Sequence, residues 1–177
     1  MPKTLYLLRH GKSSWADPQN ADFDRPLTRR GQRAAAWIGT QLAARSWQPA
    51  LVLASPAART RQTFDILNAA YTKASRPTVP LMVQYQREIY LASAEELFRR
   101  IAALPEDIPS VLLIGHNPGL HDLALSLASG AEETVALLRR GLPTAALAVL
   151  MLDAAKWSNV TSGCGHLEAL IIPPNRS

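Results

Sequence analysis

Cysteine is almost absent from this sequence, which contains only Cys164. A single thiol cannot form an internal disulfide bond, so we expect a reducing compartment, with the cytoplasm as the default. Long apolar runs are also missing, because the longest, 145–152, is far shorter than the ~20 residues of a membrane-spanning helix. The apolar stretch 5–8 near the N-terminus is too short for a signal-peptide core. The sequence therefore predicts a soluble cytoplasmic protein that has no membrane partner.

The sequence also lacks any proline-, glycine- or serine-rich linker, any internal repeat and any low-complexity tract. A chain of 177 residues with 47% hydrophobic and 19% charged residues has the composition of a globular protein. This length suits one compact core. We therefore expect a single domain over residues 1–177.

Acidic residues are outnumbered, and the formal net charge is +5. An excess of this size raises the hypothesis of nucleic-acid binding. However, the basic residues occur as scattered pairs, at 29–30, 99–100 and 139–140, without a lysine-rich tail or a basic stripe interleaved with aromatics. Solvated helix faces explain such pairs better, so no nucleic-acid partner is expected. Part of the excess can still assist binding of an anionic substrate.

Signatures of metal and cofactor sites are missing as well. None of the four histidines has a cysteine or carboxylate partner at a spacing typical of metal ligands, and there is no Walker A sequence. The glycines of 163–165 precede a predicted strand rather than a helix, so they do not form a dinucleotide-binding fingerprint. We expect no metal and no cofactor.

Short apolar runs alternate with segments of helical periodicity. The predicted buried strands are Thr4–Leu8, Leu51–Ala54, Val111–Gly115, Ala145–Leu152 and Leu167–Ile172. A weaker strand is predicted at Val79–Val83, at the edge of the sheet because Pro80 interrupts it.

Three of the intervening segments carry helix-start signals. Thr28, Ser55-Pro56 and Asn117-Pro118 are predicted N-terminal caps. The helices that follow these caps are expected to bury Ala34, Ile38 and Gln41/Leu42, then Phe64, Leu67 and Tyr71, and finally Leu120, Leu123, Ala124 and Leu127. A further helix without a cap signal is expected to bury Leu97, Phe98, Ile101 and Leu104. Strand–helix alternation of this kind predicts an α/β sandwich with a largely parallel central sheet.

Cationic side chains follow three of the predicted strands. Arg9 and His10 come directly after the first strand, Arg59 lies one helical turn beyond the second, and His116 follows the third. Because ligands of open α/β sheets gather beyond the carboxyl ends of the strands, we expect these four side chains to meet. Arginine pairs with two oxygens at once, and phosphoryl transfer depends on neutralising oxygen charge. The pattern therefore predicts a site for a phosphoryl group.

These segments resemble the histidine phosphatase superfamily, also called the phosphoglycerate mutase-like family, and within it the small SixA-type phosphohistidine phosphatase branch. The resemblance is carried, in order along nearly the whole chain, by Leu7–Trp15 with its Arg9-His10-Gly11 (RHG) motif, Asp22–Gly31, Leu53–Thr63, Leu113–Leu120 and Leu142–Ala145. It implies the three-layer α/β/α fold of that family.

By this resemblance His10 is the nucleophile, and Arg9, Arg59 and His116 hold the phosphoryl oxygens. A neutral imidazole nitrogen can attack phosphorus to give a phosphoenzyme that water then hydrolyses. His116 is expected to be protonated beside a phosphate dianion, because opposite charge raises its pKa. His10 must be unprotonated, and the surrounding cations favour that form.

The remaining candidate residues have competing interpretations. Glu88 is the best positional match to the carboxyl group with which the superfamily protonates the leaving oxygen, and the alternative is a surface carboxylate paired with Arg87. Ser13 and Asn117 can donate to phosphate, although turn and capping roles explain them equally well. Segment 25–28 is expected to order its loop and cap the next helix.

The resemblance implies a phosphatase, and the substrate class follows from what the chain has room for. Only 72–92 and 13–26 are irregular enough to build a lid, so an open site for a histidine-phosphorylated protein is predicted. The alternatives are a small-molecule phosphomonoesterase using the same His10 chemistry, and a catalytically silent phosphate-binding module. Silent modules usually lose one of the four site residues, and all four are present here.

Overall fold

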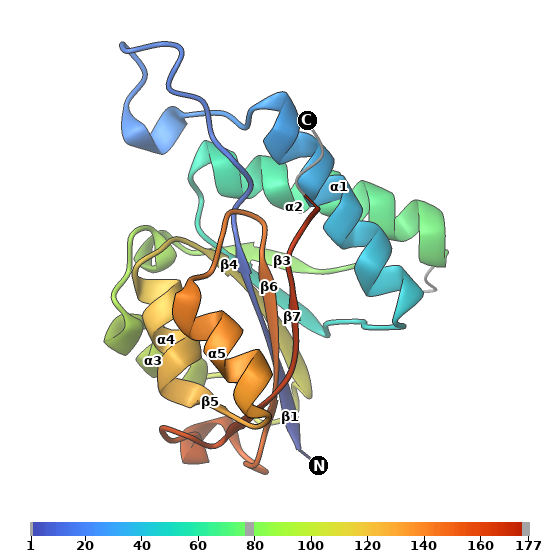
Figure 1. The fold of residues 1–177 in the computed structure, drawn as a ribbon, viewed down its shortest axis with the longest axis vertical. Helices are drawn as coiled ribbons and strands as arrows, with labels where there is room; N and C mark the ends of the chain where they lie inside the picture. The colour runs from blue at the N-terminus through green and yellow to red at the C-terminus, as the bar shows by residue number, and fades with distance from the viewer. Residues whose placement is uncertain (1, 77–79, 175–177) are drawn as a thin grey trace.

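The computed structural model describes residues 2–76 and 80–174, and within these residues one seven-stranded mixed sheet forms the centre of the molecule (Figure 1). The strand order is β3-β2-β4-β1-β6-β7-β5. The strands are β1 (Lys3–Arg9), β2 (Leu51–Ala54), β3 (Val83–Tyr85), β4 (Ser110–Gly115), β5 (Ala128–Ser129), β6 (Leu147–Leu152) and β7 (Gly165–Ile171). Strand β6 runs antiparallel to β1 and β7, and the other pairings are parallel. The expected α/β fold with a largely parallel sheet is confirmed.

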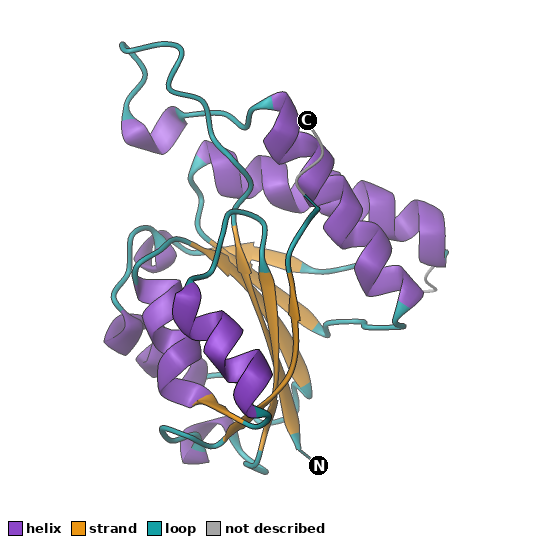
Figure 2. Cartoon of the chain, viewed as in Figure 1, coloured by secondary structure: helices purple, strands orange, loops and turns teal. Residues whose placement is uncertain are grey.

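Helices cover both faces of this sheet, so the fold has three layers (Figure 2). They are α1 (Arg29–Ala44), α2 (Ala58–Ser75), α3 (Ala94–Ala102), α4 (Gly119–Leu127) and α5 (Glu132–Arg140). Strand β1 contributes apolar side chains to both faces of the sheet, because alternate side chains of a strand point to opposite faces. Leu5 and Leu7 pack in one core with residues of α3, α4 and α5, whereas Tyr6 and Leu8 pack in the other with residues of α1 and α2.

The strand predictions agree with the structure at the centre of the sheet and differ at its margins. The late strand begins at Leu147 rather than Ala145, because Ala145 has a φ of 59° and its N–H donates to Arg9 O and His10 O. The weak strand predicted at 79–83 is an edge strand, as expected, but it runs over Val83–Tyr85. Val79 lies outside the described residues. The short strand β5 had no sequence signal.

Only one of the three predicted caps is confirmed. The Thr28 hydroxyl accepts a hydrogen bond from Gly31 N–H at 3.1 Å and starts α1. The caps predicted at Ser55 and Asn117 are wrong, because α2 begins at Ala58 and α4 at Gly119 without a side-chain cap. Both side chains are instead engaged at the carboxyl ends of β2 and β4.

The buried faces of the helices follow the predicted periodicity with small shifts. Helix α1 buries Ala35 in place of the expected Ala34, with Ile38 and Leu42 as predicted. The faces of α2 and α4 are as expected, whereas Leu104 is buried but lies beyond the end of α3. Helix α5 was not predicted, although its residues Val135 and Leu138 reach the core.

A close backbone contact at Gly119 positions the start of α4. A Cβ atom at this glycine would lie 1.9 Å from Ala92 O. Only glycine permits this approach, which keeps α4 and the His116–Pro118 turn close to the segment that follows Tyr90.

We expect Gly119→Ala to destabilise the protein by about 1–3 kcal/mol, because the added methyl group forces the two backbones apart. Urea denaturation measures this loss. Gly115→Ala is the matched control, since the nearest atoms to its Cβ are 3.5 Å away and the contact is ordinary. Equal stabilities of the two variants would contradict the argument.

No helix in the described part of the chain is long and apolar enough to cross a membrane.

Candidate active site

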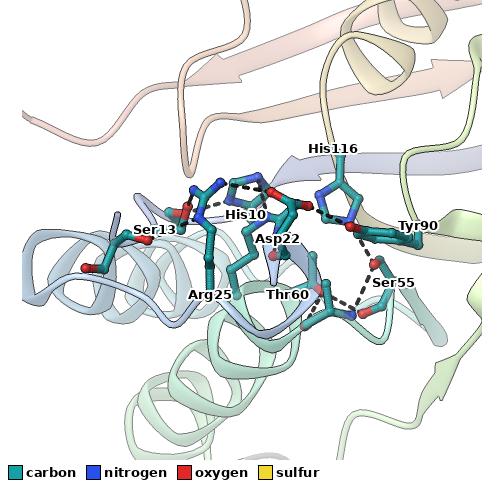
Figure 3. A network of polar contacts seen from close by, with 12 residues as sticks. His10, Ser13, Asp22, Arg25, Ser55, Thr60, Tyr90 and His116 are labelled. Atoms are coloured by element: carbon teal, nitrogen blue, oxygen red, sulfur yellow. Dashed lines mark hydrogen bonds and ion pairs between the residues drawn. The ribbon is translucent and has the colours of Figure 1, made fainter. Parts of the chain in front are cut away.

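The three strand ends that carry the predicted cationic residues meet at one edge of the sheet (Figure 3). The rings of His10 and His116 have their centroids 5.2 Å apart. Arg59, which lies in the first turn of α2, donates from Nε to His10 Nε2 at 3.3 Å. All three side chains are buried. Chain folding therefore brings both imidazoles and the Arg59 guanidinium group around one point.

The hydrogen bonds of His10 define which of its nitrogens can react. Nδ1 lies 2.7 Å from Gly11 O, a carbonyl that can only accept, so Nδ1 carries the proton. Nε2 is then the unprotonated nitrogen, and its lone pair faces the Arg59 guanidinium group. Thr63 fixes this segment, because its hydroxyl accepts from Gly11 N–H at 3.0 Å and donates to Arg59 O at 2.6 Å.

His116 is held by the hydroxyl group of Ser55. The distance from His116 Nε2 to Ser55 Oγ is 2.7 Å, and the same oxygen accepts from Ala57 N–H at 3.3 Å. The Ser55 hydroxyl hydrogen is available to Nε2, and in the tautomer that accepts it the ring proton lies on Nδ1. His116 Nδ1 is buried and has no hydrogen-bond partner among the described residues. This contact explains why Ser55 does not cap α2.

Burial and positive charge keep both histidines neutral. Burial lowers the pKa of His10 to about 4, together with the charges of Arg59, Arg9 and Arg25 and against the opposing hydrogen bond to Gly11. Burial, then the His10 and Arg59 charges, lower the pKa of His116 to about 3. The low pKa of His10 matches the demand on a nucleophile. The low pKa of His116 means that its ring is neutral at pH 7 in this structure, and its protonation beside a phosphate dianion stays a prediction.

These pKa values predict that stability falls as the pH is lowered. An unfolded histidine has a pKa of ~6.5, so below that pH the unfolded chain binds protons that folded His10 and His116 do not. For His10 alone we expect a loss of about 2 kcal/mol between pH 7 and pH 5. Urea denaturation at the two pH values should show this loss in the wild type and a correspondingly smaller one in His10→Gln. An equal pH dependence in both proteins would refute it.

Arg9 and Asn117 share one backbone acceptor beside the histidines. Arg9 Nη1 donates to Leu142 O at 3.1 Å, and Asn117 Nδ2 donates to the same oxygen at 2.9 Å. Arg9 Nε and Asn117 Oδ1 are buried without a partner among the described residues. Burial, followed by repulsion from Arg59, lowers the pKa of Arg9.

An acidic residue that the sequence interpretation did not assign, Asp22, lies against the cationic groups. Its carboxylate accepts from Arg59 Nη2 at 3.0 Å, from Arg25 Nη1 at 2.9 Å and from the Tyr90 hydroxyl at 2.6 Å. The Tyr90 hydrogen bond and the two guanidinium groups lower the pKa of Asp22, so the carboxylate is charged at neutral pH. Asp22 therefore engages both terminal nitrogens of Arg59, with its backbone oxygen at Nη1 and its carboxylate at Nη2.

Tyr90 is the second residue that was missed. Its ring packs edge-on against His116 with centroids 5.4 Å apart. The only available signal was its position two residues after Glu88, within a segment already suspected of reaching the site.

The loop 13–26 is ordered by Arg25, as predicted for segment 25–28. Arg25 donates to Ser14 O at 3.1 Å, to Asp22 and to the buried hydroxyl of Ser13, and its guanidinium group stacks on the ring of Trp15. The Ser13 hydroxyl therefore has Arg25 as its partner, and any phosphate contact of Ser13 stays a prediction.

Glu88 does not lie with the other candidates. Its side chain is 69% exposed, and Glu88 Oε1 is 3.6 Å from Arg100 Nη2. Neither the site nor Arg87 supplies its ion-pair partner. The structure gives Glu88 no contact with His10, Arg59 or His116, so its role as proton donor has no geometric support here.

The chemistry of the cluster is that of an anion site. Arg59 donates to the buried Nε2 of His10, and two further buried nitrogens, Arg9 Nε and His116 Nδ1, have no hydrogen-bond partner among the described residues. A phosphoryl group carries the acceptor oxygens that these donors need. In the described ranges, no three histidine, cysteine or carboxylate side chains gather as a metal site would require.

Comparisons with known proteins agree with this geometry. The sequence model of the histidine phosphatase superfamily (branch 1) matches residues 5–82. A solved structure of a candidate phosphohistidine phosphatase SixA from Agrobacterium tumefaciens is 34% identical, with a TM-score of 0.76 and coverage of 98% of this chain and 99% of the other. A candidate SixA from Nakamurella is 30% identical, with the same TM-score and coverage of 98% and 97%.

The chain is also similar in sequence to a protein that is named only as uncharacterised. An uncharacterised protein of Mycobacterium tuberculosis is 34% identical over 169 residues, which cover 94% of this chain and 99% of the relative.

Proposed function

This chain belongs to the SixA-type branch of the histidine phosphatase superfamily, and we propose that it hydrolyses phosphohistidine on another protein through a covalent intermediate on His10. The family makes the chain a phosphatase, and the substrate is the proposal. The observation that carries the mechanism is the lone pair of His10 Nε2 directed at the Arg59 guanidinium group, with His116 beside it.

In the first step, His10 Nε2 attacks phosphorus. A bond forms between Nε2 and phosphorus while the phosphorus–nitrogen bond of the substrate phosphohistidine breaks, and the electron pair of that bond stays on the departing imidazole. Arg9 and Arg59 neutralise the phosphoryl oxygens, and Arg59 exchanges the Asp22 carboxylate for the substrate. His116 gains a proton beside the dianion and donates a hydrogen bond from Nδ1.

The departing imidazole needs one proton. A protonated His116 can supply it, because Asp22 is held ionised and Glu88 is exposed and paired with Arg100. Imidazole leaves more readily than an alkoxide once protonated, so a phosphohistidine substrate makes less demand on a carboxylic acid than a phosphate ester does.

In the second step, water attacks phosphorus and the bond to His10 Nε2 breaks. The electron pair returns to Nε2, inorganic phosphate leaves, and a proton of the attacking water passes to neutral His116 or to solvent. The low pKa of His10 returns the ring to its reactive form without a separate deprotonation.

A protein substrate fits the surroundings of the cluster. Asp22, which accepts from the Arg59 fork, is 42% exposed at its side chain, so the cluster opens to solvent there. Trp15, on the same loop, is 72% exposed and presents an aromatic surface beside that opening. A phosphorylated side chain on a folded partner can reach an opening of this kind, and two similar solved structures are named as candidate phosphohistidine phosphatases.

The proposal is tested by a substrate panel on the purified protein. Phosphate release is measured from a phosphohistidine-bearing phosphotransfer protein, from free phosphohistidine and from phosphoglycerate and sugar phosphates. We expect the highest kcat/KM with the protein. Efficient turnover of a small phosphate ester without turnover of the phosphohistidine protein would replace the proposal by the small-molecule phosphomonoesterase alternative.

A further inference from the structure

A groove of about 450 Å³ lies beside the catalytic cluster, between the start of α1, the loop before β6 and the end of β7. Its apolar surface comes from Trp37, Ile172 and three prolines, and its cationic residues are Lys12, Arg30 and Arg33. In Figure 1 the first turns of α1 and the C-terminal end of the described chain lie next to each other at this place. Neither His10, Arg59 nor His116 lines the groove, so it is a separate surface.

The charges in this groove are unbalanced. No aspartate or glutamate lines it among residues 2–76 and 80–174. Among the described residues, no ion pair involves Lys12, Arg30 or Arg33, although five ion pairs occur elsewhere. All three side chains are exposed. The groove therefore combines an apolar floor with three cations that no neighbouring carboxylate neutralises.

The groove and the catalytic cluster share their supporting segments. The backbone of Gly31 packs on that of Gly11 and Lys12, so closely that a Cβ at Gly31 would lie 2.3 Å from Lys12 O. On the other wall, Pro143 and Thr144 follow Leu142, whose carbonyl holds Arg9. On both walls, residues that line the groove therefore lie one or two positions along the chain from His10 or from Leu142, which binds Arg9.

We propose that this groove docks an acidic segment, with apolar side chains among its carboxylates, of the histidine-phosphorylated protein. The inference rests on the proposed function, and it names the part of the partner that is recognised apart from the phosphoryl group. Carboxylates pair with Arg30, Arg33 and Lys12, while an apolar side chain covers Trp37 and the prolines. Complementary charge of this kind steers the diffusional encounter of the two proteins and fixes the register of the bound segment.

Charge selects this occupant over a second copy of the chain. The chain has a net charge of +5, so a second copy would bring further positive charge toward a cationic groove. Acidic residues are also the partners for which arginine forks are best shaped.

The binding test uses a fluorescein-labelled peptide of alternating acidic residues and leucines, followed by fluorescence polarisation. We expect the double charge reversal Arg30→Glu/Arg33→Glu to weaken its binding about tenfold or more. The matched control is Lys73→Glu/Lys156→Glu, which makes the same change in net charge at exposed lysines outside the groove and is expected to bind as the wild type does. A peptide with serine in place of leucine should bind more weakly to the wild type.

Activity measurements separate this inference from the proposed function. The groove reversal should lower kcat/KM for a phosphohistidine phosphotransfer protein about tenfold while leaving that for free phosphohistidine within about twofold. Lys12 is left unchanged because it lies two residues from His10. If the wild type ignores the phosphoprotein, the proposed function fails, and the peptide measurement still decides whether the groove binds acidic segments.

Three results would overturn the docking inference. The first is no measurable peptide binding by the wild type, and the second is equal loss of binding in the groove and control reversals, which would indicate a general charge effect. The third is concentration-dependent dimerisation in sedimentation that the groove reversal abolishes, which would assign the groove to a second copy.

Discussion

His10→Gln is expected to lower turnover of a phosphohistidine substrate by at least ~10⁴-fold, because removing a catalytic nucleophile leaves only binding and electrostatic effects. The glutamine amide cannot attack phosphorus, since its nitrogen has no available lone pair. Phosphate release under single-turnover conditions measures the loss. His116 is not expected to replace His10, because its Nε2 is engaged by Ser55 Oγ.

His121→Gln supplies the matched control for this substitution. His121 lies on α4, and its Nε2 contacts Leu138 O at 2.7 Å, away from the phosphoryl site. The same chemical change at this position should leave kcat/KM within about twofold. If His10→Gln kept more than about a tenth of the wild-type activity, His10 would not be the nucleophile.

Arg59→Ala carries the second large expected effect, a loss of ~10³-fold in kcat/KM. Arg59 contacts both the proposed nucleophile, through Nε, and Asp22, through its terminal nitrogens. Its removal takes away charge neutralisation in the transition state and the hydrogen bond that orients His10 Nε2. The kcat/KM of Arg59→Lys should exceed that of Arg59→Ala by less than about tenfold, because an ammonium group lacks the planar fork of the guanidinium group.

The matched control is Arg61→Ala on the same helix. The Arg61 side chain is exposed, donates to Pro56 O at 2.9 Å and stacks on Tyr85, so it contributes charge near α2 without reaching the cluster. Its activity is expected to stay within about threefold of the wild type. Equal losses in the two variants would show that Arg59 acts through the fold of α2 and not through the phosphoryl group.

The sheet and the cationic cluster were predictable because both depend on strong local signals. Strand β1 is an apolar run that ends at Arg9-His10, and the parallel neighbours β2 and β4 end beside it, so topology alone brings Arg59 and His116 to the same edge. The failed caps have a local cause. Ser55 and Asn117 had suitable side chains, but His116 and Leu142 O, distant in sequence, engage them.

The contribution of Asp22 and Tyr90 could not be predicted from spacing. Each lies in an irregular segment, and their contact with each other joins positions 68 residues apart. Glu88 illustrates the reverse case, since sequence position suggested the site whereas the one-turn segment Arg87–Ile89 buries Ile89 and leaves Glu88 exposed beside Arg100. Side-chain direction in so short an element depends on tertiary packing.

Rapid acid-free quenching with mass spectrometry tests the central claim most directly. The wild type, mixed with a phosphohistidine-bearing protein, should carry a phosphoryl group on His10, and NMR of the labelled protein should place it on Nε2. His116→Ala should slow the turnover of this intermediate, because His116 is the proposed proton acceptor for the attacking water. A phosphoryl group found on another residue, or steady turnover with no label on His10 in either protein, would contradict the account.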